Sequence, residues 1–222
     1  MLHKTRGIVF RFTKYGDTSI IVNIFTELFG LQAYIVNGVR NKTSRNKIAL
    51  YQPLTLLELV VYHRENANIN RIKELKCLHP FQSLSVDIKK SAMGMFIIEI
   101  LNKTVKEESH AKEIFEFLFT SLVKLDAAQH HYENFHLIFL VKLSRYLGFG
   151  AHNLNEIIGS RMVDEDVENI LTTMLTTEYD YNLTISATQR RVCLEQLLKF
   201  FNDHIDTLGE LKSIHILREV LS

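Results

Sequence analysis

Positively charged side chains gather in one short stretch of the sequence, residues 37–47, which reads NGVRNKTSRNK. The stretch contains no Asp or Glu, and its cations are Arg40, Lys42, Arg45 and Lys47. Cations without neighbouring carboxylates suit a polyanion with regularly spaced phosphates. A solvated surface loop has the same composition, so the stretch alone leaves both interpretations open. The chemistry that the stretch indicates is reversible phosphate binding. The surrounding sequence has to decide between phosphate binding and a solvated loop.

The net charge of +1 hides an uneven distribution of charge along the 222 residues. Residues 1–78 carry twelve Lys/Arg against five Asp/Glu, a balance of +7. Residues 79–222 carry fourteen against twenty, a balance of −6. Halves of opposite sign are typical of a chain in which one half binds nucleic acid.

Aromatic residues are interleaved with the cations of the basic part. The rings are Phe10, Phe12, Tyr15, Tyr34 and Tyr51, and the cations nearest to them in the sequence are Arg6, Arg11, Lys14 and Arg40. A basic groove with exposed rings can hold a single strand, because every base has a face on which a ring can stack. Most of these rings are nevertheless needed for a hydrophobic core, so each is more often a core residue than a base contact.

The elements that must position these side chains are short strands. Alternation of apolar and polar residues, with turns between, predicts five of them, at residues 4–14, 19–26, 31–39, 50–63 and 69–78. Five strands in under eighty residues indicate a small barrel, for which the oligonucleotide-binding fold is the five-stranded candidate. An SH3-like barrel would produce nearly the same pattern, and periodicity does not separate the two.

The period becomes helical after His79-Pro80. Helices are expected at residues 86–106, 111–125, 134–147, 164–176, 187–205 and 211–221. The segment 134–147 is apolar nearly all round, which predicts the central buried helix of a bundle. The fold class is therefore α+β, with a barrel domain over residues 1–80 and an α-helical domain over residues 81–222.

No pattern of catalytic or metal-binding residues is present, so we expect neither an enzyme nor a cofactor. The sequence lacks GxxxxGK[ST], GxGxxG, GxSxG and HExxH. His130, His131 and His136 are not spaced as metal ligands, and Cys77 and Cys193 lie far apart. Two isolated cysteines, no apolar run of about 18 residues and no signal-like start predict a cytoplasmic protein without a membrane segment.

Several short motifs occur in an order that resembles a known family. They are the turn at residues 15–19, Thr26-Glu27 with Gly30, Gly38-Val39-Arg40, Gln52-Pro53-Leu54 and the helical FHLIFLVKLSRYLGF. Together they resemble the RecO family of bacterial DNA repair proteins over essentially the full chain. Many members carry four cysteines shortly after the central helix, where this chain has none, so the resemblance is to a form without zinc. The local structure of residues 150–185 is the least constrained by these motifs.

The resemblance implies an oligonucleotide-binding domain followed by an α-helical domain. It implies a non-enzymatic recombination mediator that binds single- and double-stranded DNA and anneals complementary strands. Such proteins work with RecR and the single-stranded DNA-binding protein to load RecA. The basic residues that match the DNA-binding domain of the family are Arg6, Arg11, Lys14, Arg40, Lys42, Arg45 and Lys47.

A second hypothesis comes from a different class of protein. The basic barrel could serve as an interaction adaptor that docks acidic peptide tails, for instance the tail of a single-stranded DNA-binding protein. Salt dependence separates the hypotheses, because contacts to several phosphates make binding steeply salt-dependent and a short peptide does so much less.

Overall fold

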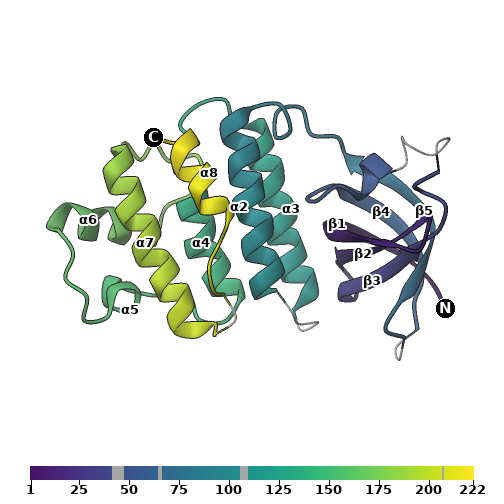
Figure 1. Cartoon of the computed structure of the whole chain (residues 1–222). Helices are drawn as coiled ribbons and strands as arrows, with labels where there is room; N and C mark the ends of the chain where they lie inside the picture. Colours follow the sequence, from purple (N-terminus) through teal and green to yellow (C-terminus); the bar gives the residue numbers. More distant parts are fainter. Residues whose placement is uncertain (42–47, 65–66, 106–109, 207) are drawn as a thin grey trace. The chain divides into compact units, whose positions relative to one another are not determined.

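The computed structural model describes residues 1–41, 48–64, 67–105, 110–206 and 208–222. Its first part is a barrel of five strands (Figure 1), as the sequence predicts. The strands are β1 (Leu2–Tyr15), β2 (Ser19–Thr26), β3 (Gly30–Val36), β4 (Leu56–Tyr62) and β5 (Asn70–His79). The fourth is shorter than expected, because Ala49–Tyr51 forms a 3₁₀ turn, η2, before β4 begins.

The strands close into a barrel in the order β1-β2-β3-β5-β4. The long strand β1 makes closure possible, since it pairs antiparallel with β4 through residues 2–8 and with β2 through residues 7–15. Strands β3 and β5 run parallel, with Tyr34 opposite Asn70. This connectivity is that of the oligonucleotide-binding fold, which resolves the SH3-like alternative.

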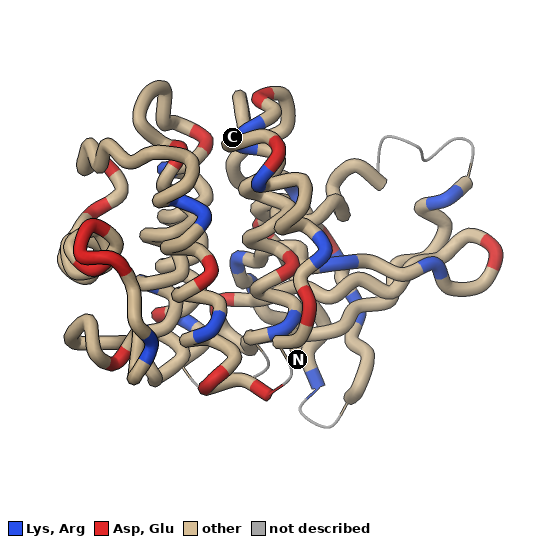
Figure 2. The backbone as a smooth tube through the Cα atoms, turned by 60° about the vertical axis from the view of Figure 1, so that its left-hand side comes forward, with Lys and Arg blue, Asp and Glu red and all other residues tan. Residues whose placement is uncertain are grey.

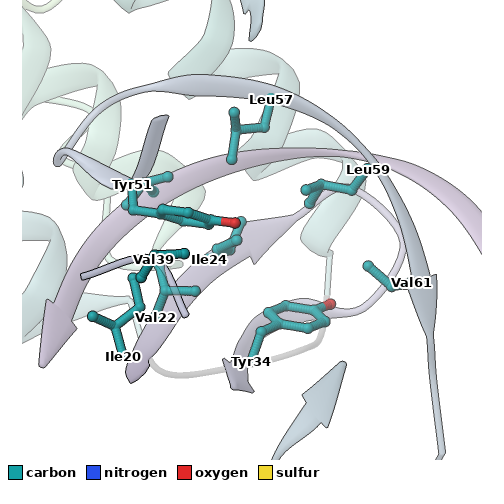
Figure 3. Close-up of a cluster of buried hydrophobic side chains, with 10 residues drawn as sticks. Ile20, Val22, Ile24, Tyr34, Val39, Tyr51, Leu57, Leu59 and Val61 are labelled. Atoms are coloured by element: carbon teal, nitrogen blue, oxygen red, sulfur yellow. The ribbon is translucent and has the colours of Figure 1, made fainter. Parts of the chain in front are cut away.

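Side chains that alternate along the strands fill the barrel interior (Figure 3). On β2, Ile20, Val22 and Ile24 point inward and are fully buried. The rings of Tyr34 and Tyr51 lie among these aliphatic side chains. The buried cluster consists of Val9, Ile20, Val22, Ile24, Tyr34, Val39, Tyr51, Leu57, Leu59 and Val61.

A bulge in β1 determines which way its cations point. The register with β2 passes from Val9 directly to Arg11, so Phe10 is an additional residue. Strict alternation would put Arg11 on the same face as Val9, inside the barrel. The bulge moves Arg11 to the outer face, where it is exposed, and turns Phe12 toward the interior cluster.

The chain forms two compact units, and it passes from one unit to the other more than once. The first unit comprises Met1–Phe81 and Val105–Leu122, and the second comprises Gln82–Thr104 and Val123–Ser222. The first part of helix α3 (Ala111–Ala127) therefore groups with the barrel. The predicted division into residues 1–80 and 81–222 has a single boundary, so it does not include the return of Val105–Leu122 to the first unit.

The part of α3 that belongs to the first unit packs on the outer side of β1. The guanidinium carbon of Arg6 lies 4.9 Å from the centre of the Phe115 ring. Ile8 and Phe25, which face outward and oppose each other on β1 and β2, are fully buried. The middle of β1, around Arg6 and Ile8, is thus covered on both faces, whereas Leu2 and Lys4 are exposed. This cover is why the hydrophobic alternation of β1 is imperfect in the sequence.

The second unit is helical. Besides the last residues of α3, its helices are α2 (Ile88–Thr104), α4 (Phe135–Tyr146), α5 (Leu154–Ile158), α6 (Glu165–Met174), α7 (Ala187–His204) and α8 (Ser213–Val220). Helix α4 contacts α2, α6 and α7 and buries most of its side chains, which confirms the prediction of a central helix. Helix α7 begins with a capping box in which Ser186 and Gln189 bond each other's backbone N–H. Helix α5 was not predicted, and its start is marked by Asn153, whose side chain accepts a hydrogen bond from the Glu156 N–H.

In the described part of the chain, no helix combines the length and the apolar character that crossing a bilayer requires.

Candidate nucleic-acid interface

Two hydrogen bonds hold Arg40 against the turn between β1 and β2. Its backbone N–H donates to the carbonyl oxygen of Thr18, and its Nη1 donates to that of Gly16, each at 3.0 Å. The preceding residue, Val39, is buried in the barrel core. The beginning of the basic stretch is therefore fixed to this turn, with Arg40 partly exposed. The other predicted cations of the stretch, Lys42, Arg45 and Lys47, lie outside the described residues.

The second half of β1 leads to the same turn. Lys14 and Tyr15 directly precede the turn and are exposed, so Lys14 and Arg40 meet at one end of the barrel. Arg11, three residues before Lys14, is exposed on the outer face; with the Asn23 amide oriented to accept, its Nε and Nη2 donate to the amide oxygen at 3.0 and 3.3 Å. Neither Arg11 nor Lys14 has an ion-pair partner in the part of the chain that the structure describes.

Arg6 has a different environment from the other predicted DNA contacts. Its Nε and Nη2 donate to Oε2 and Oε1 of Glu27, both at 2.9 Å, and Nη2 also donates to Oε1 of Glu116 on α3. Its guanidinium lies over the rings of Phe115 and Phe119, with the ring centres 4.9 and 5.6 Å away. Such a planar, two-pronged arrangement is characteristic of a structural Arg–carboxylate pair.

The electrostatics of this cluster follow from its geometry. Hydrogen bonds to Glu27, opposed by burial and strengthened by Glu116, raise the pKa of Arg6. The hydrogen bonds from Arg6 lower the pKa of Glu27 below its ordinary value, although burial acts in the opposite direction. Two carboxylates therefore balance the charge of Arg6, and a phosphate-binding role would have to compete with both of them.

The remaining cations of the barrel differ in whether a carboxylate neutralises them. Lys4 and Lys76 both pair with Glu58, at 2.8 and 3.2 Å. Arg64, after β4, and Arg71, on β5, are exposed and have no carboxylate partner among the described residues. In Figure 2, Lys and Arg recur along the barrel strands, while Asp and Glu occupy few positions there. The sequence-based reasoning missed Arg64 and Arg71, whose signal was their position beside the β4–β5 connection.

The structure separates the five aromatic residues of the basic part into core and surface. Phe10, Tyr34 and Tyr51 are buried and Phe12 is half-buried. Burial raises the pKa of the Tyr51 hydroxyl to about 12, in agreement with a place in the core. Tyr15 is the exposed member of the set, at 53% of its surface, and lies beside the turn that binds Arg40.

Among the described residues there is no group of three or more His, Cys, Asp and Glu side chains that could hold a metal ion. His136 is fully buried on α4, and this burial lowers its pKa to about 3. An imidazole in that environment is neutral near pH 7 and serves as a packed core residue.

The barrel defines the class of protein. It is an oligonucleotide-binding-fold protein, and folds of this kind bind their ligands on the β2–β3 face and on the loops β1–β2 and β4–β5. Lys14 and Arg40 lie at the first of these loops, and Arg64 lies in the second. The geometry therefore offers cations at the places where the fold class binds oligonucleotides.

Comparison with known proteins identifies the family. Residues 1–81 match the family described as "Recombination protein O N terminal", and residues 85–156 match "Recombination protein O C terminal". The chain is 33% identical to the DNA repair protein RecO of Bacteroides fragilis over 241 residues and 34% identical to that of Flavobacterium psychrophilum over 238 residues, with 99% of each chain covered in both cases. It is 32% identical to the RecO of Phocaeicola vulgatus over the whole of both chains. The chain belongs to the RecO family of DNA repair proteins.

Proposed function

We propose that this protein is a recombination mediator in DNA repair, which binds single- and double-stranded DNA and anneals complementary strands without chemical turnover. In this role it acts with RecR and the single-stranded DNA-binding protein to promote the loading of RecA, in the cytoplasm. The observation that carries the proposal is an oligonucleotide-binding barrel, in a RecO-family chain, whose cations at the β1–β2 turn are not neutralised by any described carboxylate.

The proposed mechanism is neutralisation of phosphate charge. Two complementary strands repel each other, and cations that displace their counterions reduce that repulsion while leaving the base edges free. The proposed phosphate contacts are Arg11, Lys14, Arg40, Lys42, Arg45 and Lys47, with Arg6 in a supporting role because of its two carboxylate partners.

The helical unit has the charge expected of a protein-binding part. The residues of this unit, 82–104 and 123–222, carry twelve Lys/Arg against sixteen Asp/Glu, and this balance of −4 disfavours extended contact with DNA. Arg190, a cation of α7, is engaged in hydrogen bonds within the protein. Its Nε donates to Asn134 Oδ1 at 2.9 Å, and its Nη1 donates to the Leu221 carbonyl oxygen at 2.8 Å. RecR and the single-stranded DNA-binding protein are thus the partners proposed for the helical unit.

A strand-annealing assay tests the function directly. Complementary oligonucleotides are mixed with and without the protein, and with and without single-stranded DNA-binding protein coating both strands. The expected result is faster annealing with the protein, also on coated strands. A protein that leaves annealing at the spontaneous rate in both conditions would rule out the proposal.

A salt series separates DNA binding from the adaptor hypothesis. Six phosphate contacts give a slope of log K against log salt of about −5 on duplex and about −4 on single strands. A barrel that only docks acidic peptide tails would bind those peptides with a much flatter slope and would not bind DNA.

A further inference from the structure

A row of register partners runs across the outside of the barrel. From strand to strand, the paired positions are Leu2, Tyr62, Arg71, Ile35, Ile21 and Thr13. These positions alternate with core residues such as Val61 and Val22 and so face away from the interior. The row contains no acidic residue.

Tyr62 is the aromatic residue of this row, and it is open to solvent. It ends β4, with 45% of its surface exposed, while the preceding Val61 is fully buried in the core. The neighbouring Leu2 is exposed to 46%. A large ring held at a fixed strand position and left uncovered has a free face on which a planar group can stack.

Two uncompensated cations flank this ring. Arg71 opposes Tyr62 across β4 and β5, and Arg64 follows it by two residues at the start of the β4–β5 connection. Both are exposed, and neither has a carboxylate partner in the described residues. The loop also contains Glu65, which lies outside the described residues.

We infer that Tyr62 is a base-stacking residue for single-stranded DNA, with Arg71 and Arg64 holding the phosphates on either side of the stacked base. This inference rests on the proposed function and names a contact site that the basic stretch does not include. A ring between two cations fits a single strand, because its bases are free to stack and its phosphates flank each base. The bases of a duplex are already stacked on each other, so duplex DNA can contact only the two cations of this site and not the face of the ring.

The outer face of β2 and β3 has no aromatic side chain in its centre, which makes the Tyr62 site more important for stacking. Its outward side chains in the centre of the sheet are Ile21 and Asn23 on β2 and Ala33 and Ile35 on β3, none of which is aromatic. Stacking on the described barrel therefore falls to the two exposed tyrosines, Tyr15 at the β1–β2 turn and Tyr62 at the β4–β5 connection.

The experiment compares three DNA substrates of about 15 nucleotides, within the range of one oligonucleotide-binding fold. They are a single strand with 2-aminopurine among its bases, an abasic strand with the same backbone, and a duplex. The variants are Tyr62→Leu, which keeps apolar bulk but loses the ring, and Tyr62→Phe, which keeps the ring. Tyr181→Leu is the matched control, since Tyr181 is a similarly exposed tyrosine, at 53%, in the helical unit.

Tyr62→Leu should weaken binding of the base-containing strand roughly 5- to 150-fold and abolish the protein-induced quenching of 2-aminopurine. Tyr62→Phe should retain both, and Tyr181→Leu should change neither. Affinity for the abasic strand and the duplex should stay within about twofold, because no base is available to stack there. Arg71→Gln should weaken both single strands alike and flatten the single-strand salt slope by about 0.7.

Unchanged affinity and quenching in a folded Tyr62→Leu variant would overturn the inference and leave the proposed function standing. An equal loss on the abasic strand would also overturn it, because Tyr62 would then support the fold and not a base. If Tyr62→Leu does not fold, the site is still supported when Tyr62→Phe keeps the quenching and Arg71→Gln shows the smaller salt slope. Loss of quenching in a folded Tyr62→Phe variant, or an unchanged salt slope in Arg71→Gln, refutes it. A wild-type protein that binds none of the three substrates refutes the proposed function and this inference together.

Discussion

Arg6 and Glu27 are joined through both their side chains and their backbones. The guanidinium of Arg6 makes two hydrogen bonds of 2.9 Å to the Glu27 carboxylate, and the Glu27 N–H donates to the Arg6 carbonyl oxygen at 3.1 Å. The pair ties β1 to the end of β2 next to the first part of α3, where Glu116 supplies a second carboxylate. A cation predicted to contact DNA is thus also a structural cation of the barrel unit.

Replacing Arg6 should reduce stability more than replacing an exposed cation. Arg6→Gln leaves Glu27 and Glu116 without their partner, and we expect a loss of about 1–3 kcal/mol in the free energy of unfolding. Arg11→Gln, at an exposed position of the same strand, should stay within about 0.5 kcal/mol and serves as the control. Chemical denaturation of both variants measures the difference, and equal stability would argue against a structural role.

The Glu27 carboxylate should make part of the stability pH-dependent. Arg6 lowers its pKa in the folded protein below the value of about 4.3 expected in the unfolded chain. The pair therefore contributes fully above the unfolded pKa and loses its contribution as the pH falls through the folded pKa. The difference in unfolding free energy between wild type and Glu27→Gln should be constant above about pH 5.5 and shrink below about pH 4. A difference that does not change between pH 7 and pH 3 would contradict this.

The basic stretch should be a principal DNA contact, and Lys42, Arg45 and Lys47 can be tested without disturbing the anchored Arg40. Changing these three to Glu should weaken every DNA substrate alike, because phosphate contacts carry little sequence information. The salt slope should flatten by about 2 on single strands and about 3 on duplex. Lys4→Gln is a suitable control, since Lys4 already pairs with Glu58. Binding of the triple variant with wild-type affinity and slope would place the DNA elsewhere.

The fold should not depend on a metal ion. A structural zinc site normally has four Cys or His ligands. The two cysteines, Cys77 on β5 and Cys193 on α7, lie in different compact units, and no group of three or more His, Cys, Asp and Glu among the described residues could hold a metal ion. A chelator should therefore leave the melting temperature unchanged. Elemental analysis that finds about one tightly bound zinc per chain, together with a lower melting temperature in chelator, would contradict the prediction.

The two thiols should differ strongly in reactivity. Cys193 is fully buried, and burial raises the pKa of its thiol to about 12, whereas Cys77 is exposed. The thiolate is the nucleophile, so an alkylating reagent at pH 8 should label one cysteine in the native protein and two after denaturation. Rapid labelling of both in the native state would show that α7 opens readily.

The sequence allowed the main elements to be predicted but not the contacts that join distant segments. The bounds of β2 and the burial of α4 follow from alternation and helical periodicity. The outward direction of Arg11 depends on a bulge at Phe10, and a bulge changes the register without a distinct local composition. The ion pairing of Arg6 depends in part on Glu116, which is 110 residues away in the chain. Local patterns identify cations, but only the tertiary structure decides which of them a carboxylate neutralises.

Strand β1 is shared between two neighbours, and this arrangement limits how the barrel can associate with other chains. A sheet with a free edge offers a row of unpaired N–H and C=O groups to any extended segment that meets it. The strand order of the barrel is closed, because β1 pairs with both β2 and β4. Among the described residues, free edge is therefore confined to parts of strands, such as β3 and β5 beyond their two paired positions. A closed strand order with only short free edges lowers the risk of aggregation by strand addition. We therefore expect other molecules to contact the barrel mainly through side chains and loops, contacts that form and break without opening it.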